Sequence, residues 1–281
     1  MTTLNQIDFS GNNASQEFVK SLKETGFAVI KNHPINPQLI ADVFKEWAEF
    51  FASDYKMNYL YHNDTQDGLF PTSVAEKAAG YDVKDIKEFY HYYIWGQYPK
   101  ELSDKTKILR EQMTDVAITL LNWIEDDLPE DVSRALSEPL SKMVENSPQT
   151  LMRILHYPPL TGNEEKGAIR ASAHKDTNLL TVLVAASQSG LQVQDTKGEW
   201  IDIPVDPGML AINIARMLSL VTNDLYKSTL HRVINPSDEK KHLSRYSIPL
   251  FLHPRPDVKL KDDLTAAEML NARRRELGIK K

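Results

Sequence analysis

Apolar residues recur with a helical period over much of the first 145 residues. After Asn36 and Pro37, a typical helix start, they fall every three or four positions up to residue 51, which predicts an amphipathic helix. Its apolar stripe is expected to cover the outside of a β-barrel. Gly26 is followed by the pattern of a short strand, residues 26–30. Further helices are predicted at residues 15–24, 102–128 and 131–144.

After residue 150 the pattern changes to short β-prone runs separated by turns rich in Gly, Pro, Asn and Asp. Many short strands at this spacing predict a sandwich or barrel, so the expected fold class is mainly β with flanking helices. We expect residues 1–145, a helical and mixed region, to pack on residues 146–281 as one integrated domain. The predicted strands are residues 151–157, 179–185, 191–195, 200–203, 209–214, 228–232 and 244–252, and the last helix is residues 265–280.

The composition is that of an ordinary globular protein, with 41% hydrophobic and 26% charged residues. A net charge of −6 leaves no basic excess to neutralise phosphates, which argues against a nucleic-acid partner. No apolar run approaches the roughly 20 residues that span a bilayer, and the first residues lack the blocks of a signal peptide. The chain has no cysteine, which excludes thiolate chemistry. We therefore expect a cytoplasmic monomer or weak homo-oligomer that binds no membrane.

Two histidines and one carboxylate supply the candidate chemistry. In His174-Lys175-Asp176 the first and third side chains leave an extended backbone on the same side, so both can reach one metal ion. His231 would then come from another strand. Two imidazoles and a carboxylate suit Fe(II) and leave coordination positions open. The alternative for an isolated His-x-Asp is an imidazole hydrogen-bonded to a carboxylate without metal, while Lys175, turned away from its neighbours, is expected to be solvated.

An arginine follows this group. Arg245 lies 14 residues after His231 and offers a planar fork that can pair with a carboxylate. Ser247 lies two residues further on, on the same face, and can add a hydroxyl. A buried guanidinium needs an anion, which is either a protein carboxylate in a structural salt bridge or the carboxylate of a ligand.

Residues 54–95 are rich in aromatic side chains without a clear period. Phe70 could belong to an aromatic substrate mouth or to an edge strand with packed rings, and the pattern leaves both open. His91 is expected to be a surface or hydrogen-bonded core residue, and His156 faces away from its neighbour Tyr157. His253 could face the mouth of a cavity, although such a residue more often satisfies a backbone group.

Five motifs resemble, in order, those of the bacterial type of the isopenicillin N synthase-like family of iron(II)/2-oxoglutarate-dependent dioxygenases. Each is weak alone, but all five at family-like separations are specific, and the resemblance covers most of the chain. The motifs are Arg153-Ile154-Leu155-His156-Tyr157-Pro158-Pro159, His174-Lys175-Asp176, Gly190-Leu191-Gln192-Val193, Tyr226-Lys227-Ser228-Thr229-Leu230-His231-Arg232-Val233 and Arg245-Tyr246-Ser247-Ile248-Pro249.

The resemblance implies a double-stranded β-helix, or jelly roll, as the catalytic core. It also implies that the protein oxidises a small molecule with dioxygen while 2-oxoglutarate is converted to succinate and carbon dioxide. Because Asp176 fills the position that related halogenases leave free, hydroxylation, desaturation or cyclisation ranks above halogenation. The implied sites are His174, Asp176 and His231 for Fe(II), Arg245, Ser247 and Tyr157 for 2-oxoglutarate, and Phe251, with Phe70 as a further candidate, for the substrate.

Two departures from the family pattern bear on this expectation. Family members often carry Asn where this chain has Leu155, so one hydrogen bond to the cosubstrate is expected to be missing or replaced. The family's Asn-x-Gly-Asp reads Asn213-Ile214-Ala215-Arg216 here, without the permissive glycine and the acidic cap. Two alternatives stay open: a family oxidase that uses dioxygen without 2-oxoglutarate, and a non-catalytic β-barrel that binds a small acid or a metal.

Overall fold

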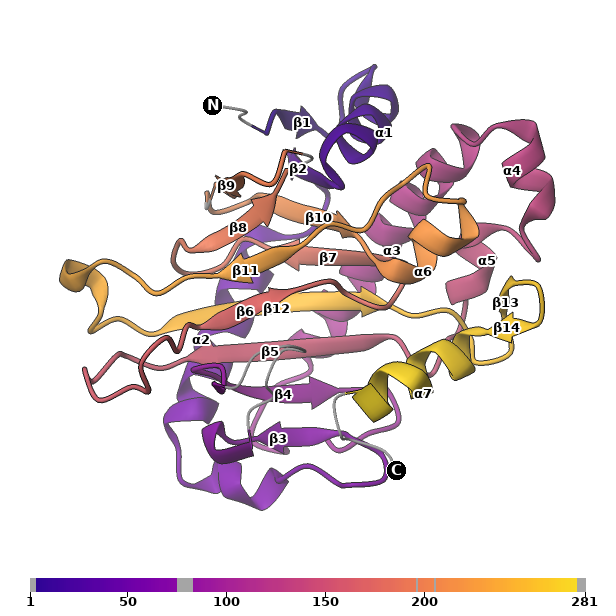
Figure 1. The fold of residues 1–281 in the computed structure, drawn as a ribbon. Helices are drawn as coiled ribbons and strands as arrows, with labels where there is room; N and C mark the ends of the chain where they lie inside the picture. The colour runs from indigo at the N-terminus through magenta and orange to yellow at the C-terminus, as the bar shows by residue number, and fades with distance from the viewer. Residues whose placement is uncertain (1–3, 75–82, 196, 205, 277–281) are drawn as a thin grey trace.

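The computed structural model describes residues 4–74, 83–195, 197–204 and 206–276. A large and a small β-sheet face each other at its centre (Figure 1). The large sheet has the order β1-β2-β10-β7-β12-β5-β4-β3 and the small sheet the order β6-β11-β8-β9. All neighbouring strands are antiparallel except β1 and β2. The strands are β1 (Gln6–Asp8), β2 (Phe27–Lys31), β3 (Gly68–Phe70), β4 (Glu88–Tyr92), β5 (Leu151–Tyr157), β6 (Ala171–His174), β7 (Leu180–Val184), β8 (Leu191–Gln194), β9 (Trp200–Asp202), β10 (Leu210–Ile214), β11 (His231–Val233) and β12 (Arg245–Leu252), with β13 (Lys259–Lys261) and β14 (Leu264–Thr265) in a separate hairpin.

Helices cover the side of the large sheet that faces away from the small sheet. In Figure 1, α2 and α3 lie behind the strands. The helix α2 begins as predicted, because the Asn36 side chain accepts hydrogen bonds from the backbone N–H groups of Gln38 and Leu39. The helices are α1 (Ala14–Thr25), α2 (Pro37–Ala52), α3 (Lys105–Asp126), α4 (Glu130–Ala135), α5 (Leu140–Val144), α6 (Arg216–Val221) and α7 (Ala266–Glu276), with short 3-10 turns η1 (Tyr55–Tyr59), η2 (Thr72–Val74) and η3 (Asp238–Lys240).

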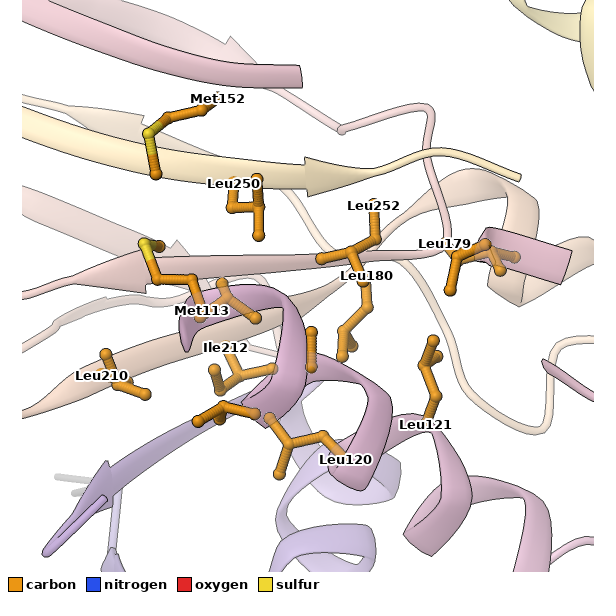
Figure 2. Close-up of a cluster of buried hydrophobic side chains, with 14 of the residues drawn as sticks. Met113, Leu120, Leu121, Met152, Leu179, Leu180, Leu210, Ile212, Leu250 and Leu252 are labelled. Atoms are coloured by element: carbon orange, nitrogen blue, oxygen red, sulfur yellow. The ribbon is translucent and has the colours of Figure 1, made fainter. Parts of the chain in front are cut away.

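The main core lies between α3 and the back of the large sheet. Figure 2 shows Met113, Leu120 and Leu121 of α3 with residues from four neighbouring strands, all of them fully buried. Each buried side chain of this kind contributes about 1.5–3 kcal/mol. Strand alternation then sends every second residue of the same strands to the opposite face, toward the small sheet. The strand residues labelled in Figure 2 are Met152, Leu180, Leu210, Ile212, Leu250 and Leu252.

Most predicted elements are confirmed to within a few residues, and two predictions are wrong. The single helix expected at residues 131–144 is two helices, α4 and α5, because Pro139 cannot lie inside a helix and the chain is extended at Leu136. The strand expected at residues 228–232 begins only at His231.

Strands from both parts of the chain build the large sheet. The strand β2 pairs with β10, and β4 pairs with β5, so the regions 1–145 and 146–281 share one hydrogen-bonded sheet. Within the described residues, no helix combines the length and apolar character needed to cross a bilayer.

Candidate metal centre and its two cavities

Three potential metal ligands meet at the small sheet. His174 ends β6 and His231 opens β11, and the two residues are directly opposite each other in the strand register. Asp176 follows two residues after β6. The Asp176 Oδ1 atom lies 3.7 Å from His174 Nε2 and 3.6 Å from His231 Nε2, and one ligand atom of each residue lies within 4.8 Å of the others. Two nitrogens and one oxygen at this spacing fit a single Fe(II) ion.

The second oxygen of Asp176 is fixed by hydrogen bonds. Asp176 Oδ2 accepts from Thr181 Oγ1 at 2.8 Å and from Asn213 Nδ2 at 2.9 Å, which leaves Oδ1 turned toward the histidines. Burial alone would raise the pKa of Asp176, but the two histidines and these hydrogen bonds hold it below its ordinary value. The carboxylate is therefore charged and oriented before any metal binds.

His174 is held in the form that can bind a metal. Its Nδ1 atom lies 2.8 Å from the carbonyl oxygen of Ser172, so Nδ1 carries the proton and Nε2 offers its lone pair. Burial in the cavity wall, together with neighbouring His231, lowers the pKa of His174 to about 4. His231 Nδ1 is buried without a hydrogen-bond partner among the described residues.

An inner cavity of about 70 Å³ extends from the ligands toward the large sheet. Arg245 and Ser247 of β12 line its wall, and Tyr157 of β5 is directly opposite Arg245 in the register. The Arg245 guanidinium carbon lies 5.1 Å from the centre of the Tyr157 ring. All three residues that the family resemblance assigned to 2-oxoglutarate therefore meet in one cavity with the ligand triad.

Two buried arginines lie in this region: Arg245 lines the inner cavity, and Arg170 is near Arg245. Arg245 is 1% exposed, donates from Nε to the Gln188 carbonyl oxygen at 3.0 Å, and has no partner for Nη1. Arg170, also 1% exposed, donates to the Leu243 carbonyl oxygen but leaves Nε and Nη1 without partners. Burial and the nearby Arg245 lower the pKa of Arg170 to about 10. Among the described residues neither arginine forms a salt bridge, so the pair favours an anionic ligand.

An outer cavity of about 160 Å³ lies on the other side of His174 and Asp176. Besides His174 and Asp176, the residues Lys87, Arg153 and Phe251 line both cavities and so mark the boundary between them. The helix α7 lies near the end of the sheet where β12 finishes and supplies part of the outer wall (Figure 1). Further residues of the outer wall are Gln66, Asp85, His91, Tyr93, Lys175, His253 and Arg274.

Comparisons with known proteins agree with this geometry. The family model of the 2OG-Fe(II) oxygenase superfamily matches residues 148–254, and that of the N-terminal region of non-haem dioxygenases in morphine synthesis matches residues 4–113. The 2-oxoglutarate-dependent dioxygenase citB from Monascus ruber is 31% identical over 258 residues, which cover 84% of this chain and 77% of that protein. The chain belongs to the 2OG-Fe(II) oxygenase superfamily.

Two solved structures have the same fold as this chain. A crystal structure of an oxygenase from Shewanella oneidensis has a TM-score of 0.89 at 46% identity and covers 99% of both chains. A full-length Neurospora crassa protein, solved in complex with alpha-KG and thymine, has a TM-score of 0.79 at 22% identity, covers 96% of both chains, and supports the fold alone. The expected double-stranded β-helix is confirmed.

The protein is thus an Fe(II)/2-oxoglutarate-dependent dioxygenase. The predicted reaction class, with release of succinate and carbon dioxide, is confirmed. The residues present fit the cofactors, because the ligand triad suits Fe(II) and the unpartnered N–H groups of Arg245 suit an acid.

Other residues predicted from the sequence have different places in this dioxygenase. Phe70 lines neither cavity: its ring is stacked between Tyr61 at 4.3 Å and Phe89 at 4.7 Å, which matches the edge-strand interpretation. Phe251 does line both cavities. His156 lies on the other face of β5, between Glu88 and Ser244.

Of the two alternatives for His253, the structure matches the one that places it at a cavity. It lines the outer cavity, is 8% exposed, and has no hydrogen-bond partner for Nδ1 among the described residues. Lys175 is exposed as expected and also borders the outer cavity.

The two departures from the family pattern leave the triad intact. Leu155 adds an apolar wall to the inner cavity, directly opposite Ser247. Ala215 has φ −109° and ψ 175°, an extended conformation that needs no glycine. Arg216 is exposed at the start of α6.

Proposed function

We propose that His174, Asp176 and His231 are the Fe(II) ligands of this dioxygenase. The observation that carries this assignment is the carboxylate of Asp176: one oxygen is tied to Thr181 and Asn213 while the other lies between the two Nε2 atoms. In a metal-free imidazole–carboxylate pair, the ring nitrogen would lie within hydrogen-bond distance of the carboxylate oxygen. Here both Nε2 atoms lie too far from Asp176 Oδ1 for a hydrogen bond, at 3.7 and 3.6 Å.

We further propose that Arg245, Ser247 and Tyr157 hold 2-oxoglutarate by its far carboxylate in the inner cavity. Bound Fe(II), with 2-oxoglutarate and dioxygen, supplies the oxidative decarboxylation that drives substrate oxidation. The chain itself orients these groups. Arg245 offers a fixed donor toward the carboxylate, since Gln188 holds its Nε, and the apolar wall of Leu155 excludes water from the cosubstrate.

The outer cavity is the proposed substrate site. It borders His174 and Asp176, and Phe251 lies between it and the inner cavity, so a bound molecule would lie against the open side of the triad. We also propose that the protein is a cytoplasmic monomer or weak homo-oligomer without a nucleic-acid or membrane partner. The net charge of −6 supports the absence of a nucleic-acid partner.

Anaerobic addition of Fe(II) and 2-oxoglutarate tests the ligand assignment. We expect a visible charge-transfer band and, in air, succinate release above background. His174→Ala and Asp176→Ala should abolish the band and lower succinate release by at least about 100-fold, because each removes a ligand. His242→Ala, an exposed histidine outside both cavities, is the matched control and should leave both unchanged. A band that persists in either ligand variant would contradict the assignment.

A further inference from the structure

Lys87 is a buried lysine at the boundary between the two cavities. It lies just before β4, which is the neighbour of β5 in the large sheet (Figure 1). Its side chain is almost fully buried and lines both the inner and the outer cavity. The ammonium lies 5.9 Å from the centre of the Phe89 ring. Lysine is rarely buried unless its charge is paired, so the groups around this ammonium decide its role.

Asp85 pairs with this ammonium and joins it to β6. Asp85 Oδ2 accepts from Lys87 Nζ at 2.8 Å. The other oxygen, Oδ1, accepts from the backbone N–H of Ser172 at 2.9 Å and from the Ser172 hydroxyl at 2.8 Å. The backbone N–H of Ile86 also donates to the carbonyl oxygen of Ile169 at 3.0 Å. The short segment before β4 is therefore held against β6 by both side-chain and backbone hydrogen bonds.

The positive charge of Lys87 acts at the metal end of the inner cavity. Ser172, which donates to Asp85, has a carbonyl oxygen that lies 2.8 Å from His174 Nδ1. Burial and the neighbouring His231 lower the pKa of His174, and the charge of Lys87 contributes to the same shift. The ammonium therefore lies close to any group that binds at the ligand triad.

The ammonium keeps donors that its pair with Asp85 does not use. A lysine ammonium has three N–H groups, and within the described residues Lys87 donates one hydrogen bond, to Asp85. Buried donors that lack a protein acceptor are normally satisfied by a ligand or by water. The remaining N–H groups of Lys87 are thus available to a ligand while the ion pair stays intact.

The other side chains near this end of the inner cavity are engaged or apolar. Thr181 and Asn213 both donate to the carboxylate of the proposed aspartate ligand. Arg153, the second cation that lines both cavities, donates to His91 Nε2 at 2.8 Å. Leu155 has no polar group to offer. A ligand oxygen at the metal end would therefore find its donor in Lys87.

We propose that Lys87 binds the cosubstrate at the end opposite Arg245, by donating to the carboxylate beside the keto group of 2-oxoglutarate. This inference rests on the proposed function of the site. 2-Oxoglutarate carries a carboxylate at each end, and the far one is assigned to Arg245, so the near one lies at the metal end with Lys87. Hydrogen bonds between charged groups are the strong ones. The contact also replaces the hydrogen bond to the cosubstrate that Leu155 cannot make.

Two oxo acids of equal chain length test the proposal. 2-Oxopentanoate has the keto acid end of 2-oxoglutarate but a methyl group in place of the far carboxylate. Each acid is titrated anaerobically into Fe(II)-loaded protein, and the charge-transfer absorbance gives its dissociation constant. Lys87→Met should weaken both acids by the same factor, about tenfold or more, because the end that they share loses a charged hydrogen bond. Arg245→Met should weaken 2-oxoglutarate alone.

Lys56→Met is the matched control. Lys56 is half-buried and pairs with Glu88 at 3.1 Å, but it lines neither cavity, so this variant should bind both acids like the unmodified protein. Lys87→Met leaves the carboxylate of Asp85 buried without its partner, which can prevent folding. The double variant Lys87→Met with Asp85→Asn removes both charges together, keeps an acceptor for Ser172, and carries the same prediction.

The proposal is wrong if both acids bind to these Lys87 variants as to the unmodified protein, or if only 2-oxoglutarate binds more weakly. Equilibrium dialysis with Fe(II) alone gives a second readout. Loss of a positive charge should not weaken Fe(II) binding, and a loss of Fe(II) affinity as large as that for the acids would assign Lys87 to supporting the triad instead. If the unmodified protein forms no band with 2-oxoglutarate, the proposed function itself fails.

Discussion

At the scale of single residues, Asp176 combines two roles in one carboxylate. Its Oδ2 atom is held by Asn213 and Thr181, while Oδ1 is the candidate ligand atom. Hydrogen bonds of this kind fix the orientation of a ligand, and their loss typically lowers metal affinity by about 10- to 100-fold. The position of Asn213 beside Asp176 follows from the pairing of β10 with β7.

Replacing Asn213 with Leu, which has the same side-chain branching, should weaken Fe(II) binding by about 10- to 100-fold, because one of the two hydrogen bonds to Oδ2 is lost and the carboxylate can rotate. The measurement is a titration with Fe(II) in the presence of saturating 2-oxoglutarate, followed by absorbance. Asn235→Leu, which loses a bond to a backbone carbonyl oxygen away from the centre, controls for general effects. Equal affinity in the Asn213 and Asn235 variants would contradict the role given to Asn213.

Several residues of the site could be predicted from the local sequence, and others could not. His174 and Asp176 lie two residues apart, and Arg245 and Ser247 share one strand, so alternation alone places each pair on one face. Arg153 could have been found by the same rule, since it lies four residues before Tyr157 on β5. The roles of Arg170 and His253 depend on which distant groups surround them, and local spacing carries no information about that.

At the scale of elements, α6 begins without the features that usually stabilise a helix start. Ala215 at the N-cap provides no side-chain hydrogen bond, and the first helical residue is the basic Arg216. A positive charge there opposes the helix dipole. The start is instead held by tertiary contacts, because the backbone N–H of Arg216 donates to the carbonyl oxygen of Asp176 at 2.9 Å.

Arg216→Asp should therefore raise the free energy of unfolding by about 0.3–1 kcal/mol, since it places a negative charge at the helix N-terminus. Arg216→Asn is the matched control for side-chain shape and should give a smaller increase in the free energy of unfolding.

Ala215→Gly should lower the free energy of unfolding by about 0.4–1 kcal/mol, because it increases the conformational freedom of the unfolded chain without relieving any strain in the folded one. Urea denaturation measures all three, and a destabilised Arg216→Asp protein would argue against the dipole explanation.

Prediction of the elements failed where one residue or a distant strand overrode a regular pattern. The apolar spacing over residues 131–144 continues across Pro139, yet α4 ends at Ala135 and Pro139 stands immediately before α5. The β-prone residues before His231 stay outside β11, because strand pairing begins only where β6 and β8 lie alongside. Pro139 is a local signal that apolar spacing alone does not include. The start of β11 depends on strands that are distant in the sequence, which residue propensity does not include.

At the scale of the whole molecule, several histidines are buried in their neutral form. Burial lowers the pKa of His253 to about 3, and burial followed by the charge of Arg153 lowers that of His91 well below its ordinary value. In the unfolded chain both would titrate near 6.5. As the pH falls below about 6.5, the unfolded state takes up protons that the folded state does not, so stability is lost.

The free energy of unfolding of the metal-free protein should therefore fall between pH 6.5 and about pH 4, by about 1.4 kcal/mol per pH unit for each such histidine. His253→Gln should reduce this slope by about one proton's contribution. Urea denaturation at a series of pH values gives the slopes. Identical slopes for the unmodified and His253→Gln proteins would show that His253 is protonated in the fold.

Because strands from both parts of the chain form the large sheet, this sheet can be completed only late in synthesis. In the large sheet Ile30 pairs with Leu210, a partner that the ribosome adds 180 residues later, and closing so long a loop is slow. The two histidines proposed as ligands, His174 and His231, likewise emerge only after more than half of the chain has been made. Iron capture is thus a late event, and nascent fragments that end before β11 have no complete cage in which to hold the ion.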